Sequence, residues 1–529
     1  MAKAAGKGRT RKSRSTMAFL RRISQGVFLA VFIVFLFLTE NTGEDELVFP
    51  VRIFLDFDPL HSITYFLATF SLPDKFYLAA VVLILTVVLG RVFCGWVCPL
   101  GSLNQLVNHR KKDRNSEGFD FRRLKYLILI GLVVGALFGL NLSGLLDPIS
   151  LTVRSLALTV IPAWNLAAVS AFDLYAGTPA GELTDPIYYF LRDHHVIAYT
   201  QPYFHQSQLL AMLFALVLLL NLRRKRFFCR YICPLGALLG AFSRRSFIRL
   251  KVDDNDCISC NLCNKVCPSG AQPWPSGEWK NTECFVCYNC VETCPARCIA
   301  IDMLYPPQTW SAGHRVDLGR RRVMTAAVTG ALAVPVTRAL PREKKPEPSV
   351  IRPPGSRREP EFLSTCVRCG ECMKVCITNG LQPAFMESGI EGLWTPVFDM
   401  KTGYCEYSCT LCGQVCPTQA IRALDVSIKR KVKIGLAFID PARCLPHAFG
   451  IDCIVCEEHC PLPKKAIWFE NKEKADREGD SRVVKLPVVD PDLCNGCGIC
   501  QNKCPVVDLP AIRISSIGES RSEKNRLLL

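Results

Sequence analysis

Residues 257–268 read CISCNLCNKVCP, so that four cysteines at short, regular intervals are followed by Pro268. Two other stretches repeat this spacing and its proline without deviation. The cysteines of the three stretches are Cys257, Cys260, Cys263 and Cys267; Cys284, Cys287, Cys290 and Cys294; and Cys494, Cys497, Cys500 and Cys504. The spacing C-x2-C-x2-C-x3-C-P is the ligand run of a cubane iron–sulfur cluster. These stretches predict ferredoxin-like folds that carry electrons.

Three further sets vary the pattern. One keeps the spacing but has Ile377 in place of proline, one has an extra residue in its first gap, and one has a long first gap. Their cysteines are Cys366, Cys369, Cys372 and Cys376; Cys405, Cys409, Cys412 and Cys416; and Cys444, Cys453, Cys456 and Cys460. We predict that all six sets bind metal, as six 4Fe-4S clusters.

The spacing also predicts that the clusters come in pairs. Three thiolates on one loop reach one cluster, and the fourth, next to the proline, reaches its neighbour. Zinc sites and disulfide frameworks also use closely spaced cysteines. Six repeats of this spacing, most with a proline, favour iron–sulfur clusters over both.

Composition indicates a membrane part. The chain has 529 residues, of which 49% are hydrophobic, and its net charge is +17. Apolar runs at 23–39, 76–93, 124–142 and 206–222 are each close to bilayer length, which predicts four transmembrane helices. The basic residues cluster beside these runs, and no nucleic-acid motif accompanies them. We therefore expect membrane lipid, and not nucleic acid, as a partner.

The basic residues also predict a topology. They flank the runs before residue 22, between 110 and 125, and after 223, whereas the loops 40–75 and 143–205 are acidic or near neutral. Under the positive-inside rule the N-terminus and the segment after the fourth run are cytoplasmic. The first run lacks a small-residue cleavage site, so it is expected to remain as a span.

An internal repeat lies at the membrane edge. FCGWVCPLGSL at 93–103 and FCRYICPLGAL at 228–238 bring in Cys94, Cys98, Cys229 and Cys233. Residues i and i+4 are neighbours on a helix, so each pair of thiols is expected on one helix face. These cysteines would bind a cofactor, form a dithiol redox couple, or pack as small hydrophobes. We favour a seventh cluster. The remaining cysteine, Cys298, is interpreted as packing.

The first two cysteine sets follow a cytoplasmic segment, so that ferredoxin unit is predicted to be cytoplasmic. GRRRVMTAAVTGALAVPVTRALP at 319–341 then has a basic head and a mildly apolar stretch, like a twin-arginine export signal. The alternative is a linker helix with every cluster in the cytoplasm. A charged, Pro-rich linker follows, and then four cysteine sets in one unit. By analogy, the first of these four sets would pair with the fourth, and the second with the third.

These motifs resemble the NapH/NapG type of quinol dehydrogenase subunit, also MauN/MauM-like. Residues 1 to about 310 resemble the membrane protein NapH in both FCxxxCPLG phrases and in the ferredoxin unit that follows. Residues 319–529 resemble its exported partner NapG, or MauM, in the arginine head and four cluster sets. The chain thus looks like a natural fusion of the two. Ile377 departs from the family pattern. The resemblance implies oxidation of menaquinol or ubiquinol and electron transfer to a periplasmic cytochrome c or reductase.

Quinol oxidation needs a proton acceptor near the ring. The candidates are Asp147 and Arg154, after the third run, and His194, His195 and His205, before the fourth. Asp147 would equally serve as a helix cap before Pro148, and the histidines would equally be solvated. No C-x-x-C-H haem site and no flavin or nicotinamide fingerprint is present, so another chain is expected to perform the terminal chemistry.

The predicted fold is a membrane all-α bundle of four transmembrane helices, with a possible fifth, joined to α+β ferredoxin-like domains. Its predicted parts are a basic cytoplasmic N-terminus (1–22), a NapH-like membrane domain (23–250), a two-cluster ferredoxin domain (251–310), a signal or anchor (319–341), a linker (342–361) and a four-cluster domain (362–529). The chain is expected in the bacterial inner membrane, with its last domain in the periplasm. Two alternatives are an assembly factor for a metalloenzyme and a conduit that reduces quinone.

Overall fold

The structure is a computed structural model that describes residues 11–40, 47, 50–107, 121–175, 179–194, 196–198, 201–275, 279–303, 319–338, 349–475, 481–522 and 525. The chain divides into two compact units. Unit 1 comprises residues 1–36, 53–155 and 209–334, and unit 2 comprises 37–52, 156–208 and 335–529. Each unit therefore combines apolar helices with one of the cysteine-rich regions.

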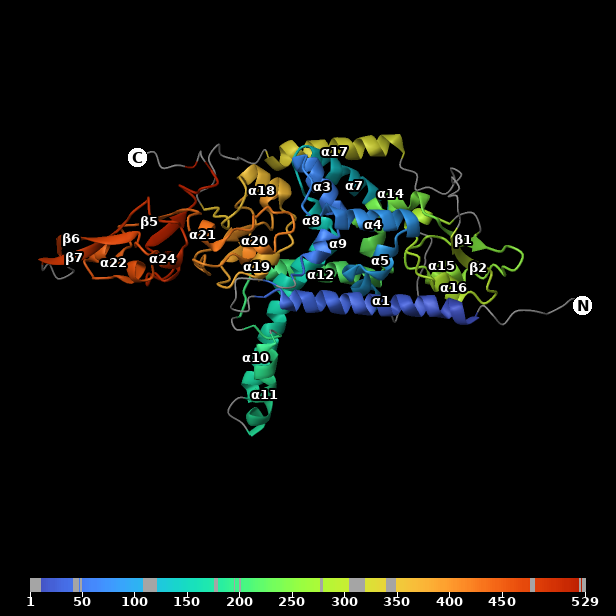
Figure 1. Ribbon diagram of the computed structural model, residues 1–529, viewed down its shortest axis with the longest axis horizontal. Helices are drawn as coiled ribbons and strands as arrows, with labels where there is room; N and C mark the ends of the chain where they lie inside the picture. Colours follow the sequence, from blue (N-terminus) through green and yellow to red (C-terminus); the bar gives the residue numbers. More distant parts are fainter. Residues whose placement is uncertain are drawn as a thin grey trace, which may run out of the picture. The chain divides into compact units, whose positions relative to one another are not determined.

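Unit 1 is mainly helical (Figure 1). Its apolar part contains α1 (Arg11–Leu38), α2 (Ile53–Asp56), α3 (Pro59–Thr69), α4 (Phe76–Leu89), α5 (Val92–Trp96), α6 (Pro99–Val107), α7 (Arg122–Leu137), α8 (Ser143–Leu146), α9 (Pro148–Ser155), α12 (Ser207–Leu219), η2 (Leu220–Leu222), α13 (Phe227–Tyr231), α14 (Pro234–Phe242) and η3 (Ser243–Arg245). Its ferredoxin part contains β1 (Ile248–Val252), α15 (Leu262–Val266), η4 (Asn281–Glu283), α16 (Asn289–Thr293) and β2 (Ile299–Met303), and α17 (Arg320–Arg338) follows.

The internal repeat of the sequence is an internal repeat of the fold. Helices α5 and α13 have five residues each, and α6 and α14 have nine each. A residue with a positive φ angle precedes each pair of helices. Gly90, which ends α4, has φ +73°, and Arg226, which precedes α13, has φ +52°. Glycine adopts such a conformation without steric cost, so Gly90 suits the end of α4.

The prediction of four transmembrane helices is not supported, because among the described residues its first run alone coincides with a helix of membrane length. Among the described residues, Thr16–Leu38 and Pro148–Tyr175 are long and apolar enough to cross a membrane, and Phe76–Leu89 and Ser207–Leu222 are shorter apolar helices. The prediction of a loop over 143–205 was wrong for most of its length, because helices occupy 143–146, 179–193 and, at membrane length, Pro148–Tyr175. Pro148, Arg154, Pro162 and Asn165 lower the apolar content of this helix, which hid it in the sequence.

The ferredoxin part of unit 1 has the predicted α+β character. Strands β1 and β2 pair antiparallel, from Ile248 opposite Met303 to Val252 opposite Ile299, and thereby join the two ends of the cysteine-rich segment. Helix α17 packs closely on α7 within this unit, because a Cβ added to Gly330 would lie 2.7 Å from the Gly131 carbonyl oxygen. Small residues allow such close helix contacts.

Unit 2 contains the four C-terminal cysteine sets. Its helices are η1 (Leu156–Val160), α10 (Ile161–Tyr175), α11 (Pro179–Asp193), α18 (Glu359–Thr365), α19 (Glu371–Lys374), η6 (Ile390–Gly392), α20 (Leu411–Gln414), α21 (Val426–Lys429), α22 (Leu445–Phe449), α23 (Val455–Glu458) and α24 (Ile499–Asn502). Its strands are β3 (Leu381–Pro383), β4 (Pro396–Phe398), β5 (Leu436–Ile439), β6 (Ile467–Ala475), β7 (Ser481–Val489) and β8 (Ile512–Ser515). They form two-stranded antiparallel sheets: β3–β4, β5–β8 and β6–β7.

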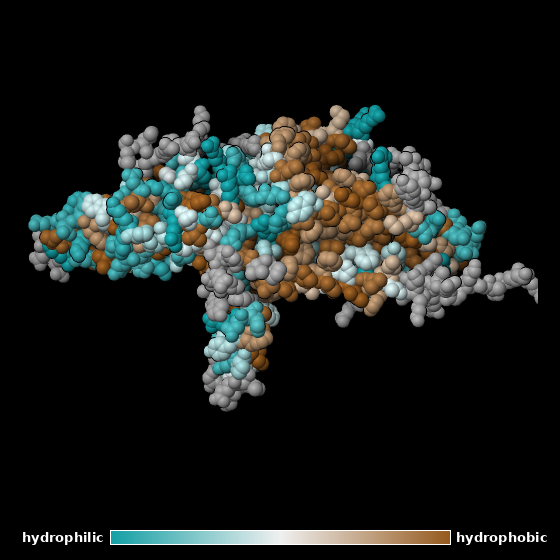
Figure 2. All heavy atoms as spheres, in the orientation of Figure 1, coloured by the Kyte–Doolittle hydropathy of each residue, from teal (hydrophilic) through white to brown (hydrophobic). Residues whose placement is uncertain are grey.

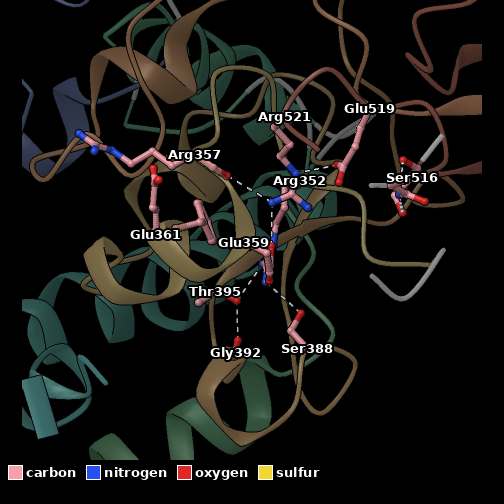
Figure 3. Close-up of polar contacts among 12 residues, drawn as sticks. Arg352, Arg357, Glu359, Glu361, Ser388, Gly392, Thr395, Ser516, Glu519 and Arg521 are labelled. Carbon is pink, nitrogen blue, oxygen red and sulfur yellow. Dashed lines mark hydrogen bonds and ion pairs between the residues drawn. The ribbon is translucent and has the colours of Figure 1, made fainter. Parts of the chain in front are cut away.

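An ion-pair network ties the C-terminal end of unit 2 to helix α18 (Figure 3). Glu359 accepts hydrogen bonds from Arg352 (2.6 and 3.2 Å) and from Arg521 (2.7 Å). Burial alone would raise the pKa of Glu359, but the two guanidinium groups outweigh it and lower that pKa to about 2. The network therefore stabilises the ionised carboxylate.

The surface differs between the two units. Exposed large hydrophobic side chains are frequent on α1 and α4 of unit 1, and Figure 2 shows hydrophobic residues gathered on this part of the molecule. Examples are Phe19, Val27 and Val34 on α1 and Ile84 on α4. An apolar surface of this size on helices of a folded unit is typical of contact with lipid or another protein.

Candidate electron-transfer sites

The last two cysteine sets exchange their fourth cysteines. One cavity is lined by Cys444, Cys453 and Cys456 together with Cys504 of the following set. A second cavity is lined by Cys494, Cys497 and Cys500 together with Cys460 of the preceding set. Each cavity thus offers four thiols, three from one loop and one from its neighbour. This donor set fits a cluster with the cross-ligation of two-cluster ferredoxins.

The ferredoxin part of unit 1 shows the same exchange. A cavity there is lined by Cys284, Cys287 and Cys290 together with Cys267 of the first set. Conversely, the thiol of Cys294, the fourth cysteine of the second set, lies beside the first set, because it interacts with Cys263. Its Sγ is also 3.5 Å from Sγ of Cys298, so Cys298 is a fifth thiol next to a four-thiol site.

The first two sets of unit 2 are also neighbours. Burial raises the pKa of Cys372 most, and the neighbouring thiols of Cys369, Cys366, Cys416 and Cys412 raise it further. Burial likewise raises the pKa of Cys412 most, and the neighbouring thiols of Cys405, Cys409 and Cys376 raise it further. The expected pairing of first with fourth and second with third set was therefore wrong. The sets pair in chain order, the first with the second and the third with the fourth.

The repeat cysteines of unit 1 converge on one place. Cys98 interacts with Cys229 and Cys94, and Cys233 interacts with all three. The expectation of two thiols on one helix face was wrong, however. Helix α5 ends at Trp96 and α6 begins at Pro99, so each C-x3-C pair lies across a helix break.

These four thiols are largely buried. Burial raises the pKa of the Cys98 and Cys233 thiols well above the usual value. A reactive dithiol typically has a lowered pKa and an exposed sulfur. Asn104 donates toward Cys229 Sγ at 3.6 Å, and the Gly236 N–H donates to Cys233 Sγ at 3.2 Å. The surroundings thus resemble those of ligand sulfurs more than those of an exchanging pair.

Two equivalent arginines stand next to the four thiols. Arg91 and Arg226 occupy the same place in the two repeats, two residues before each FCxxxCPLG phrase. Arg91 lies 3.9 Å from Cys94 Sγ, and Arg226 donates to the Cys94 carbonyl at 2.9 Å. Both side chains are almost fully buried. The site is therefore rich in positive charge, as an anionic thiolate site requires.

Phe285 connects this site to the second ferredoxin set. It lies between Cys284 and Cys287 in the sequence and is 1% exposed. It packs in one cluster with Cys229, Cys287 and Cys94. The four-thiol site and the second ferredoxin set are thus in direct contact within unit 1.

Glu283, next to Cys284, anchors the same contact. Its carboxylate accepts hydrogen bonds from Arg91 (3.2 Å), from Tyr126 (2.9 Å) and from Lys125. Burial alone would raise the pKa of Glu283, but Lys125 and Arg91 outweigh it and lower that pKa. Two buried cations therefore face one buried carboxylate, which leaves positive charge next to the thiols.

The five predicted quinol-site residues do not form one group. Asp147 and Arg154 are fully buried in unit 1, where Asp147 caps α9 and Arg154 donates to the Gly144 carbonyl at 3.1 Å. In unit 2, His205 Nε2 is 2.8 Å from Asp399 Oδ2, and His194 is exposed. His195 lies outside the described residues.

Sequence reasoning missed Arg91, Arg226, Phe285 and Glu283. The arginines were detectable, because they hold the same position in both copies of the repeat. Glu283 and Phe285 gave no local signal. The partners of Glu283 lie 157 to 192 positions away in the chain, and Phe285 contacts Arg91 and Arg226 of the two repeats.

Comparison with known proteins agrees with this chemistry. Two families match the chain, and both are described as 4Fe-4S binding domains. One matches residues 76–116 and 204–252, where the four repeat cysteines are the only cysteines, and the other matches 250–272 and 487–507. No solved structure matches the chain.

The relatives of the chain among known proteins are ferredoxin-type proteins. The chain is 35% identical to the methylamine utilization ferredoxin-type protein MauM of Methylorubrum extorquens over 204 residues, which are 38% of this chain and 88% of that protein. The chain belongs to the NapG/MauM family of ferredoxin-type proteins. It is 34% identical to NapG of Escherichia coli over 211 residues, 39% of this chain and 89% of that protein. Like its family, the chain is an iron–sulfur protein of electron transport.

Proposed function

We propose that the chain oxidises quinol at a membrane and relays the electrons through 4Fe-4S clusters to a redox partner outside the cytoplasm. The observation that carries the proposal is the packing of Phe285 between the four-thiol site and the second ferredoxin set. Electron carriers must lie close together, and this contact joins an apolar helical region to a cluster loop. The terminal reaction belongs to a partner, such as a periplasmic cytochrome c or reductase.

We further propose seven clusters, six at the ferredoxin sets and one at Cys94, Cys98, Cys229 and Cys233. The charge around the repeat thiols supports the seventh. Arg91 and Lys125 pair with the buried carboxylate of Glu283, and Arg226 is buried over the same Phe285 ring as Arg91. Buried cations require anionic partners, and thiolates of a bound cluster supply them. When bound, such a cluster would supply one-electron transfer between quinol and the ferredoxin loops.

The contacts within each unit support a cytoplasmic first ferredoxin domain and an exported second one. In unit 1, Arg21 and Arg22, which precede the first apolar run, bind Asn289 (3.3 Å) and Glu292 (3.0 Å) of the first ferredoxin domain. In unit 2 the contacts come from residues that adjoin the two loops predicted to lie outside. Lys374 donates to the Thr39 carbonyl at 2.6 Å, and Trp394 donates to Gln206 at 3.0 Å.

A retained anchor fits the proposal better than a cleaved signal. Helix α17 holds the arginine run and packs on α7 through Gly330 and Gly131. The relatives align over 204 and 211 residues, about the length of the segment from 319 to the C-terminus. This supports the fusion of a NapH-like membrane part with a NapG-like exported part. The membrane spans are proposed to be Thr16–Leu38 and Pro148–Tyr175, with the shorter apolar helices beside them.

Quinol would bind where the apolar helices meet the four-thiol site. Oxidation releases two electrons and two protons, so a cluster and a proton acceptor must both be near. Of the predicted contacts, Arg154 on α9 remains the proposed one, because α9 packs on α6, the helix that follows Cys98. Asp147 is occupied as the cap of α9. His205 is less suited, since it is engaged by Asp399.

The side of the membrane on which each ferredoxin domain lies tests the proposal. A reporter enzyme that is active only outside the cytoplasm, fused after Leu529, is expected to be active in cells. The same reporter fused after Met303 is expected to be inactive. Lysine in place of Arg320, Arg321 and Arg322 is expected to abolish the activity of the first fusion. An inactive C-terminal fusion would contradict export and leave a conduit that faces the cytoplasm only.

A further inference from the structure

Two equivalent helix ends meet inside unit 1. Helix α3 begins with Asp58-Pro59 and α9 begins with Asp147-Pro148. Asp58 Oδ1 accepts a hydrogen bond from the Leu60 N–H at 2.8 Å, so it caps α3. Asp147 Oδ2 accepts the N–H groups of Ile149 and Ser150, both at 2.8 Å, so it caps α9. Both carboxylates are 0% exposed.

His61, on the first turn of α3, lies between these two carboxylates. Its Nε2 atom is 3.4 Å from Asp147 Oδ2 and 3.8 Å from Asp58 Oδ2. One donor atom from each of the three residues lies within 4.8 Å of the others. Distances of 3.4 and 3.8 Å are too long for well-formed hydrogen bonds. The three side chains therefore face one another at close range.

Each of the three residues keeps a buried polar atom without a hydrogen-bond partner. These atoms are Asp58 Oδ2, Asp147 Oδ1 and His61 Nδ1, and of the three only Asp58 Oδ2 is also one of the atoms that face His61 Nε2. With both carboxylates ionised, as a bound metal ion would hold them, and a neutral imidazole, the three side chains carry a charge of −2 in a buried place. Such a charge is costly in a protein interior unless a cation compensates it.

We infer that Asp58, His61 and Asp147 bind one divalent transition-metal ion, which clamps the N-termini of α3 and α9. Bonds of about 2.0–2.2 Å to a tetrahedral or octahedral ion place neighbouring donor atoms roughly 3.0–3.6 Å apart. The 3.4 Å separation fits this geometry, and the 3.8 Å separation needs a shift of a few tenths of an ångström. The ion would neutralise both carboxylates. The site uses no cysteine and is separate from the cluster sites.

The donor atoms select the kind of ion. A mixed set of carboxylate oxygens and imidazole nitrogen suits Zn²⁺, Fe²⁺ or Mn²⁺, whereas Mg²⁺ and Ca²⁺ prefer oxygen alone. Ser150 Oγ lies 2.7 Å from His61 Nε2 and competes for the same lone pair. A serine hydroxyl rotates freely about its Cα–Cβ bond, and its oxygen would otherwise serve as a fourth donor.

Zinc binding to the purified full chain with its clusters tests the inference. The protein is incubated with Zn²⁺, excess metal is removed by gel filtration, and zinc, iron and sulfide are measured. We expect the wild type to retain one more zinc per chain than Asp58→Asn or His61→Gln. Asp56→Asn is the matched control, because Asp56 is buried nearby but pairs with Lys75 (3.4 Å). Unchanged iron and sulfide would show that the variants are folded.

X-ray absorption at the zinc edge of the wild type supplies a second measurement that needs no variant. Oxygen and nitrogen donors are expected, and sulfur donors alone would overturn the inference. Equal zinc retention in wild type and both triad variants would also overturn it. So would an infrared band of a protonated carboxyl that disappears in Asp58→Asn, because the two carboxylates would then share a proton.

Discussion

Arg91 and Arg226 place their guanidinium groups over the same ring, that of Phe285, at 4.9 and 5.1 Å from its centre. The arginines come from the two copies of the repeat, and the ring comes from the second ferredoxin set. The ring of Phe285 thereby contacts both copies of the repeat and joins them to the loop of the second ferredoxin set. This contact lies on the proposed route of electrons from the four-thiol site to the second ferredoxin set.

Leucine in place of Phe285 tests this contact. A buried arginine over an aromatic ring contributes about 0.5–2 kcal/mol, so loss of both contacts is expected to lower the free energy of unfolding by about 1–4 kcal/mol. Thermal unfolding followed by cluster absorbance measures the change. The exposed Phe385 provides a control, because Phe385→Leu is expected to cost less than about 0.5 kcal/mol. Equal effects of both changes would rule out a special role for Phe285.

Glutamine in place of Glu283 removes the charge that Arg91 and Lys125 share. Breaking a buried ion pair from one side typically costs about 3–5 kcal/mol, because the remaining charge is left buried. We expect a loss of this size, together with lower occupancy of the second ferredoxin set. Glu292→Gln is the matched control, since Glu292 pairs with Arg22 at the surface and such pairs contribute about 0–1 kcal/mol. Iron content and the unfolding midpoint measure both effects.

Serine in place of Cys504 tests the exchange of fourth cysteines. The structure places Cys504 with Cys444, Cys453 and Cys456, so the variant is expected to impair the cluster of that set and spare that of its own loop. Cys460→Ser is expected to do the reverse. Electron paramagnetic resonance of the reduced variants distinguishes the two sites. Loss of the same signal in both variants would contradict the exchange.

The Glu359 network predicts a specific acid sensitivity. The pKa of Glu359 is lowered from 4.5 to about 2, so the folded state binds its proton less readily than the unfolded state. The resulting stability is present above about pH 4.5 and is lost as the pH falls toward 2. A shift of this size corresponds to at most about 3 kcal/mol.

Glu359→Gln should therefore be less stable than the wild type at pH 7, and the difference should shrink as the pH falls from 4.5 toward 2. Unfolding by urea at several pH values measures it. Glu361→Gln, on the same helix, is the control. A difference that does not depend on pH would show that the two arginines do not hold Glu359 ionised.

The sequence predicted the parts of this chain whose signals are local. Cysteine spacing predicted six four-thiol sites, and two similar phrases predicted the convergence of Cys94, Cys98, Cys229 and Cys233. Helix lengths were harder, because hydropathy does not register the break at Gly90 or the membrane-length helix that begins at Pro148. Pairing of cluster sets, the Glu283 network and the meeting of Asp58 with Asp147 depend on contacts between distant segments. No local pattern encodes those contacts.

The most direct measurement of the central claim is the reduction of the clusters by quinol. Purified protein is mixed with a menaquinol analogue without oxygen, and the loss of cluster absorbance is followed. The wild type is expected to bleach, whereas Cys94→Ser and Cys229→Ser are expected to stay at the background rate with their ferredoxin clusters intact. Cys298→Ser is the control and should behave as the wild type. Wild-type clusters that remain oxidised, or repeat-cysteine variants that bleach normally, would contradict the account.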